Sequence, residues 1–204
     1  MKSNFILKTM KTTRLLAILF ISVLSFTACQ EDDHDHDDHD HDHEHEHEEE
    51  INILRYTLTN AEDTTDVVTF TFTDEDGEGG ADGISKSLGT LTANATYTGV
   101  LELLHEEDDE KEDVGAEIAE EDAEDHEIFY ITNIAGLNFK TTDVDKNNHA
   151  LGFKTNVLTG DSGTGILTVS IIHEGKKPNN GTIEDALSAE GTTDIEVSFD
   201  VTVE

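Results

Sequence analysis

Hydrophobic and polar residues alternate along most of the chain from Ile51 onward. The clearest case is the C-terminal end, where every second residue from Ile195 to Val203 is apolar and the residues between them are polar. A period of two is typical of a strand that has one face in a core and one face in water. Similar runs occur at residues 51–59, 68–73, 95–104, 127–133, 136–141, 150–158 and 165–173, mostly separated by turns rich in Gly, Asn and Asp.

This number of strands predicts the fold class. About eight short strands indicate an all-β domain over residues 51–204, an antiparallel β-sandwich of immunoglobulin-like or related arrangement. Only the segment from Val114 to about Asp125 has helical spacing, with Val114, Ile118 and Ala119 as a narrow apolar stripe. A doubly wound α/β domain needs several such helices, so the pattern excludes that class.

The N-terminal segment has the layout of a secretory signal. Residues 1–28 contain no acid, and their apolar run from Leu15 to Phe26 is too short for the roughly 20 residues of a membrane-spanning helix. Met10 offers a second start for translation. The four basic residues are Lys2, Lys8, Lys11 and Arg14.

The end of this segment resembles the lipobox of bacterial lipoproteins. It reads Phe26-Thr27-Ala28-Cys29, and the only cysteine of the chain therefore falls where lipid is attached. Several acyl chains on Cys29 would anchor the mature protein stably to a membrane. The acidic residues that follow resemble an export signal to the cell surface. We expect a lipid anchor in the outer membrane, on the cell surface or on the periplasmic face.

Residues 31–50 consist entirely of Asp, Glu and His, with 13 acids and seven histidines. Because no apolar side chain is present and like charges repel, we expect a disordered tether over residues 29–50. Imidazole and carboxylate groups are ligands for Zn²⁺, Ni²⁺, Cu²⁺ and Co²⁺, so the tract predicts binding of a divalent transition metal that weakens as pH falls. The predicted ligands are His34, His36, His39, His41, His43, His45 and His47.

The charge balance limits the partners of the protein. With 47 acidic and 12 basic residues, the formal net charge is −35. Such a chain repels nucleic acid and favours cations, and mutual repulsion favours a monomer. The single cysteine excludes a disulfide framework and a site with four thiolates.

Further candidate ligands lie in the domain, with lower priority. His105 and His126 flank an acidic insertion and are candidates for an ordered metal site with nearby glutamates. Asp143 and Asp145 alternate as ligands of calcium loops do, and residues 74–78 have a similar pattern, but turn geometry is the favoured explanation and calcium is not expected. For the four domain histidines, which include His149 and His173, an ordinary structural role is favoured.

The sequence contains no convincing enzyme motif. The sequence Gly160-Asp161-Ser162-Gly163 resembles the nucleophile motif of serine proteases, but a hairpin turn between two strands explains it better. The chain has no His-Glu-x-x-His, no P-loop and no dinucleotide fingerprint. We therefore predict that the protein is not an enzyme.

Besides the lipobox and the acidic tail, several short motifs of the domain together carry a resemblance to a known family. They are Phe70-Thr71-Phe72-Thr73-Asp74, Asp76-Gly77, Gly79-Gly80, Tyr97, Gly99, Glu102-Leu103-Leu104, His126, Phe129-Tyr130 and Thr193-Asp194-Ile195-Glu196-Val197. With these motifs the mature chain resembles a family of small lipoproteins from Bacteroidetes-group bacteria, often labelled "type 1 periplasmic binding fold superfamily". The resemblance covers about residues 51–204 and implies no settled activity. Chain length and strand pattern favour the sandwich over the repeated βα units that the label suggests.

Two functional hypotheses follow from the sequence. The leading one is an envelope lipoprotein that binds or buffers a divalent transition metal through the histidine tract, as an accessory to an outer-membrane receptor or transporter. The alternative is a non-catalytic structural or adhesive sandwich on a polyanionic stalk. Only the first predicts that the histidines matter for growth under metal limitation.

Overall fold

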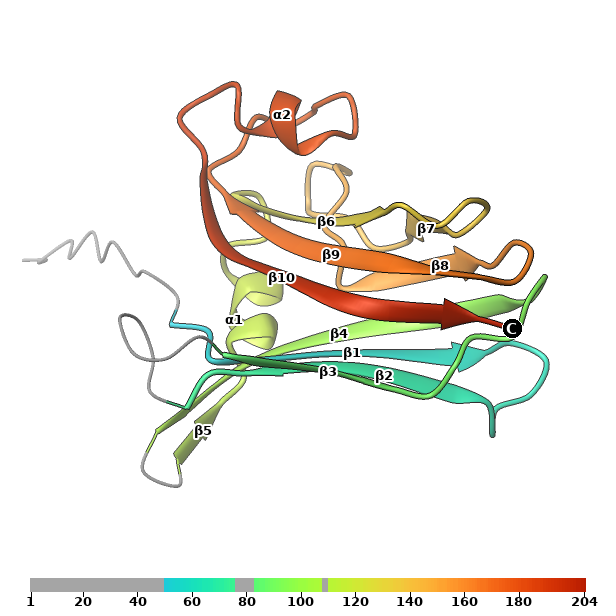
Figure 1. Cartoon of the computed structure of the whole chain (residues 1–204). Helices are drawn as coiled ribbons and strands as arrows, with labels where there is room; N and C mark the ends of the chain where they lie inside the picture. Colours follow the sequence, from blue (N-terminus) through green and yellow to red (C-terminus); the bar gives the residue numbers. More distant parts are fainter. Residues whose placement is uncertain (1–49, 76–82, 108–109) are drawn as a thin grey trace, which may run out of the picture. The chain divides into compact units, whose positions relative to one another are not determined.

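The computed structural model describes residues 50–75, 83–107 and 110–204 (Figure 1). Two antiparallel sheets form the two layers of this part of the chain, and the predicted all-β sandwich is confirmed. The described residues all belong to one compact unit. The signal segment, Cys29 and the seven histidines of the tract lie outside the described residues.

The larger sheet contains seven strands, in the order β3-β2-β1-β4-β8-β7, with β5 paired to the end of β4. Every pairing in it is antiparallel. Its strands are β1 (Ile53–Asn60), β2 (Val67–Thr73), β3 (Ile84–Leu88), β4 (Thr96–Glu107), β5 (Glu110–Glu112), β7 (Asn138–Thr141) and β8 (Lys154–Leu158).

The smaller sheet contains three strands in the order β10-β9-β6, again antiparallel. These are β6 (His126–Thr132), β9 (Gly163–His173) and β10 (Thr192–Val203). In β10, alternate residues from Val197 to Val203 are buried, as the period of two predicts.

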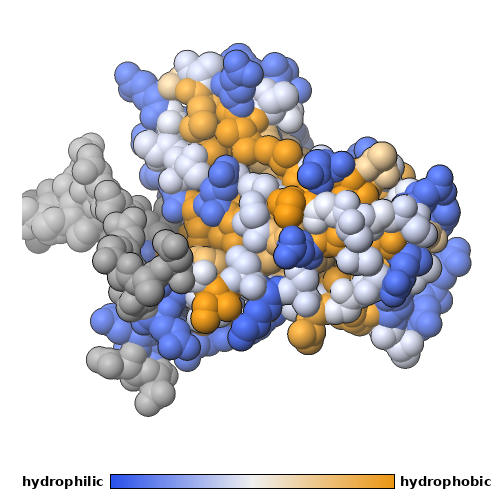
Figure 2. Space-filling view, viewed as in Figure 1, coloured by the Kyte–Doolittle hydropathy of each residue, from blue (hydrophilic) through white to orange (hydrophobic). Residues whose placement is uncertain are grey.

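The core lies between the sheets and is built from the buried alternate residues of both. Phe70 of the larger sheet and Phe199 of the smaller one meet with ring centroids 5.5 Å apart. Burying one such large apolar side chain stabilises the fold by about 1.5–3 kcal/mol. On the side shown in Figure 2, hydrophobic residues are visible mainly in the upper layer near α2, and hydrophilic residues cover much of the two ends.

Helix α1 (Val114–Glu120) closes one end of the sandwich. Its N-cap Asp113 accepts a hydrogen bond from the backbone N–H of Ala116, and Val114 and Ile118 are buried. The helix is shorter than the predicted segment to Asp125. Acidic residues follow its last turn, which contains no basic residue, and negative charge at a helix C-terminus opposes the helix dipole.

A second helix, α2 (Ile183–Ala186), was not predicted and lies in the segment 174–191 between β9 and β10. Its Ala186 packs with Phe129 and Ile172 in a small separate apolar cluster. Neither helix, nor any other in the described part of the chain, has the length and apolar character needed to cross a membrane.

Three local expectations are corrected by the structure. Strands β3 and β5 were not predicted, because all their residues are exposed and neither strand has one clearly apolar face. The motif at 160–163 is not a hairpin turn, since β8 and β9 belong to different sheets and the motif carries the chain between them. Gly160 is required there for packing, because a Cβ would lie 2.8 Å from the Cα of Gly136.

Candidate metal centre

Three adjacent strands bring His126, His173 and Asp194 together at one end of the smaller sheet. His126 begins β6 and lies directly opposite His173, near the end of β9. Asp194 lies at a β-bulge of β10, where the register shifts between Thr193 and Ile195. One ligand atom from each of the three side chains lies within 4.8 Å of the others. We call this group the His–His–Asp site.

The bulge explains why Asp194 belongs to this group. Strict alternation would place Asp194 on the same face as Glu196, which is exposed. An extra residue in one strand changes the direction of its side chain, and bulges are common near functional sites for that reason. The side chain of Asp194 is only 11% exposed.

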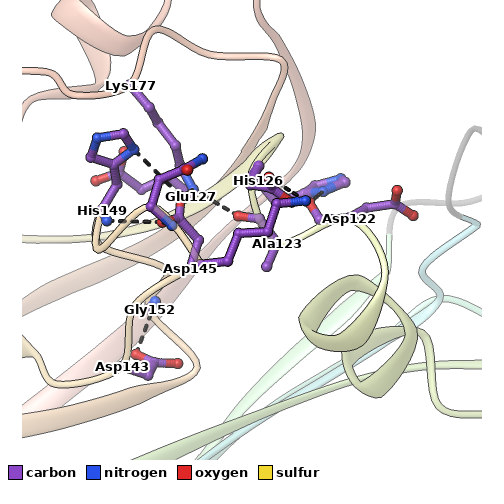
Figure 3. A network of polar contacts seen from close by, with 12 residues as sticks. Asp122, Ala123, His126, Glu127, Asp143, Asp145, His149, Gly152 and Lys177 are labelled. Atoms are coloured by element: carbon purple, nitrogen blue, oxygen red, sulfur yellow. Dashed lines mark hydrogen bonds and ion pairs between the residues drawn. The ribbon is translucent and has the colours of Figure 1, made fainter.

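The ring of His126 is fully buried and held in one orientation. Its Nδ1 lies 3.0 Å from the carbonyl oxygen of Asp122 (Figure 3), and a carbonyl can only accept, so Nδ1 carries the proton. The opposite atom, Nε2, lies 3.7 Å from Oδ2 of Asp194. The rings of His126 and His173 stack in parallel, with centroids 4.5 Å apart and planes 1° apart.

The distances between these atoms match those of a transition-metal site. Two parallel stacked rings cannot both direct a nitrogen lone pair at one ion, so one ring has to rotate when metal binds. In a tetrahedral zinc site with bonds of about 2.0–2.1 Å, ligand atoms lie about 3.4 Å apart, close to the distance from His126 to Asp194. A histidine ligand normally donates its second ring N–H to a carbonyl or carboxylate, as His126 does to Asp122. Two imidazole nitrogens and one carboxylate oxygen suit Zn²⁺, Co²⁺, Ni²⁺ or Cu²⁺ better than Ca²⁺.

The backbone next to the site is closely packed. The two ends of segment 174–191 meet at Gly175 and Gly191, where a Cβ on Gly191 would lie 2.8 Å from the Cα of Gly175. The N–H of Glu174 donates to the carbonyl of Asp125 over 2.7 Å. These contacts hold the end of β9 and the start of β10 beside β6, so the site lies on strands, one of them bulged at Asp194, rather than on a loop.

A buried ion pair lies beside this end of the sandwich (Figure 3). Lys177 Nζ lies 3.4 Å from Oδ2 of Asp145 and donates to the carbonyl of Ala123 over 2.8 Å. Burial alone would raise the pKa of Asp145, but the backbone N–H groups of His149 and Asn147, together with the Lys177 ammonium, hold this pKa below its usual range.

The pKa of a second acid near Lys177 is shifted in the opposite direction. Glu127, the neighbour of His126 on β6, accepts a hydrogen bond of 2.6 Å from the amide of Asn179. Burial raises the pKa of Glu127 in spite of this bond and of the nearby Lys177.

The predicted ligands outside the His–His–Asp site have other contacts. His105 pairs across the sheet with Glu112, and its Nε2 lies 3.7 Å from Glu50 and 4.0 Å from Glu107. It is not part of the group that contains His126, which is the only such group among the residues that the structure describes. His105 and His126 therefore do not form the joint site that their positions around the acidic insertion suggested.

Asp143 and Asp145 lie in the loop between β7 and β8, as the sequence predicted. Asp143 Oδ1 accepts from the backbone N–H of Gly152, and Asp145 Oδ1 accepts from two backbone N–H groups of the loop. Oδ2 of Asp145 faces Lys177 and, at 3.5 Å, His149 Nδ1. A calcium ion at Asp145 would have to displace an ammonium group, so the turn explains this pattern better.

The sequence pattern singled out His126 as a candidate ligand and favoured a structural role for His173, and it did not connect the two with Asp194. No local signal marks the bulge that brings Asp194 to them. Residues 76–78 of the other calcium-like segment lie outside the described ranges. The chain matches no protein-family model, no curated protein and no solved structure.

Proposed function

We propose that this protein is an envelope lipoprotein that binds a divalent transition metal ion. The observation that carries the proposal is the His–His–Asp site, in which His126, His173 and Asp194 converge from three neighbouring strands. Ligands on strands are held more precisely than ligands on loops, and that precision favours selectivity.

The histidine tract supplies a second class of ligands. Its seven imidazoles and interleaved acids attract cations but are not preorganised, so they bind several metals with little selectivity. The domain site and the tract then have different tasks, since one holds a single ion in fixed geometry and the other raises the local metal concentration. The lipid on Cys29 keeps both at the membrane, where an outer-membrane receptor or transporter would take up the ion.

Metal titration tests the proposal in a full-length variant whose tract has no histidine left to bind metal, which we call the silenced chain. A variant with all seven tract histidines replaced by asparagine keeps the charge of the tract and removes its imidazoles. We expect this variant to bind one Zn²⁺ or Co²⁺ ion in calorimetry. Bound Co²⁺ would give the strong visible absorption of a tetrahedral site.

Two substitutions, His173→Gln and Asp194→Asn, then identify the ligands. In the silenced chain each should weaken binding by about 10–100-fold or more, whereas the matched control His105→Gln should leave the affinity unchanged. If the wild type binds metal more tightly than millimolar and the silenced chain does not, the tract alone binds the metal. If neither chain binds metal, the proposed metal function is wrong, and the alternative hypothesis of a structural or adhesive module takes its place.

A further inference from the structure

The outward side of the larger sheet differs from the rest of the molecule in its basic and exposed apolar residues. Buried residues alternate along its strands, so the residues between them share one outer face. The register brings these residues into rows, for example Leu88 beside Thr69, then Thr57, then Val100. We call this surface the outer face of the larger sheet.

Basic residues are concentrated on this outer face. Five of the eight lysines and arginines in the described ranges lie at its outward positions, where the acids are Glu106, which pairs with Lys111 of β5, and Glu102, which pairs with Arg55 over 3.3 Å. The three strands of the smaller sheet contain no lysine or arginine and expose acids such as Glu196 and Asp200. The five basic residues are Arg55, Lys86, Lys111, Lys140 and Lys154.

Exposed apolar side chains are concentrated on the same face. Val100, near the middle of the face, is 49% exposed, and Leu88, on the edge strand β3, is 71% exposed. Five of the eight large apolar residues that are exposed in the described ranges lie on this face, namely Val67, Ile84, Leu88, Val100 and Leu158. Threonines of β1, β2 and β4 fill most of the space between them. The face therefore mixes apolar side chains with threonines and basic groups, rather than forming one continuous apolar patch.

The size of the face suits a specific contact. Six strands spaced about 4.8 Å apart, with about six residues each rising about 3.3 Å, span on the order of 500 Å². Two such surfaces bury about 1,000 Å² in total, which is the lower range for a specific protein interface. No element among the described residues packs on this face.

From these observations we infer that the outer face of the larger sheet binds a partner protein whose own surface is acidic around an apolar centre. Charge complementarity selects the acidic partner, because basic groups are rare elsewhere on this molecule. An anionic membrane fits less well, since the face carries only three net positive charges and no aromatic residue of the kind found at membrane interfaces. The inference rests on the envelope location in the proposed function, but it does not depend on metal binding.

Lysine footprinting of the full chain tests the contact. The lysines of the native protein are labelled with a small amine reagent, first in the outer envelope of the cells that make it and then after purification. We expect Lys86, Lys140 and Lys154 to react severalfold more slowly in the envelope. The exposed control lysines Lys146 and Lys176, which lie off this sheet, should react equally in both states.

Two further measurements identify the occupant. Protection by vesicles made from the extracted envelope lipids, without protein, would overturn the inference in favour of a membrane. Protection in the concentrated purified chain alone would overturn it in favour of a second copy. Absence of selective protection would also overturn it. Lys86→Glu with Lys154→Glu should abolish the protection of Lys140, whereas Lys146→Glu with Lys176→Glu should not.

Discussion

Lys177 places its ammonium group inside the protein, where it contacts one carboxylate and one carbonyl. Its side chain is 6% exposed and Asp145 is fully covered, so neither charge is solvated by water. Ions in such surroundings are stabilised mainly by each other, and removing one leaves the other buried without compensation. Segment 174–191, which contains Lys177, is thereby held against the loop between β7 and β8.

Replacing Lys177 by methionine should therefore destabilise the protein strongly. We expect a loss of about 3–5 kcal/mol in the free energy of unfolding, measured by urea denaturation. Lys146→Met is the matched control, because Lys146 forms an exposed pair with Glu124 and should cost less than about 1 kcal/mol. Equal costs for the two variants would show that the buried pair has no special role.

The same pair fixes a pH dependence. The pKa of Asp145 is lowered in the folded protein, so its contribution to stability is present above the usual aspartate value of about 3.9 and is lost as pH falls through the lowered pKa. Removing the Lys177 ammonium removes one of the groups that lower this pKa, so the pKa moves upward from its wild-type position. The acid loss of stability should therefore begin at higher pH in Lys177→Met than in the wild type, when urea denaturation is repeated from pH 7 to pH 3.

At the scale of elements, three strands of the larger sheet meet over Gly99. Tyr56 of β1 reaches across β4 and forms a hydrogen bond of 2.6 Å between its hydroxyl and the Oγ1 of Thr155 on β8. Any side chain at Gly99 would occupy this position, since its Cβ would overlap both hydroxyl groups. Burial of Tyr56 raises the pKa of its hydroxyl well above the usual value, so this bond stays neutral at any physiological pH.

Replacing Gly99 by alanine should therefore disturb the packing of β1, β4 and β8. We expect a cost of about 1–3 kcal/mol in urea denaturation, because overpacking forces strands apart. Gly163→Ala is a suitable control, since its Cβ would make an ordinary contact of 3.7 Å with Ile134. A tolerated Gly99→Ala would mean that Tyr56 and Thr155 can separate without loss.

At the scale of the molecule, charge opposes compactness. The net charge of −35 leaves most acids without a basic partner, and their repulsion is larger in the folded chain than in the extended one. The few strong pairs are local and do not change this balance. The concentration of basic residues on one outer face makes the repulsion uneven over the surface.

Added salt should consequently stabilise the protein. Raising sodium chloride from 0.01 to 0.15 M shortens the Debye length from about 30 to about 8 Å and screens the repulsion. A gain of about 1 kcal/mol would raise Tm by roughly 2–4 °C for a chain of this size, measurable by calorimetry. Potassium chloride should act equally, and a fall in Tm with either salt would show that attractive pairs dominate instead.

The sequence by itself determined much of the fold and little of the site. The alternation in β10 and the Gly- and Asn-rich turns depend on neighbours along the chain, so strands and the sandwich class were predictable. Strands β3 and β5 were missed because a fully exposed strand has no apolar face to detect. The tract of seven histidines and the net charge are likewise properties of composition and need no structure.

Only the tertiary structure showed which distant residues meet. Asp194 joins His126 and His173 through a bulge, and Lys177 meets Asp145 across 32 residues of chain. These meetings could not be predicted because they depend on strand register. A shift of one residue moves every side chain of a strand to the opposite face, and the long-range packing of the sheets selects the register. The ligand set and the basic outer face follow from that selection rather than from local sequence.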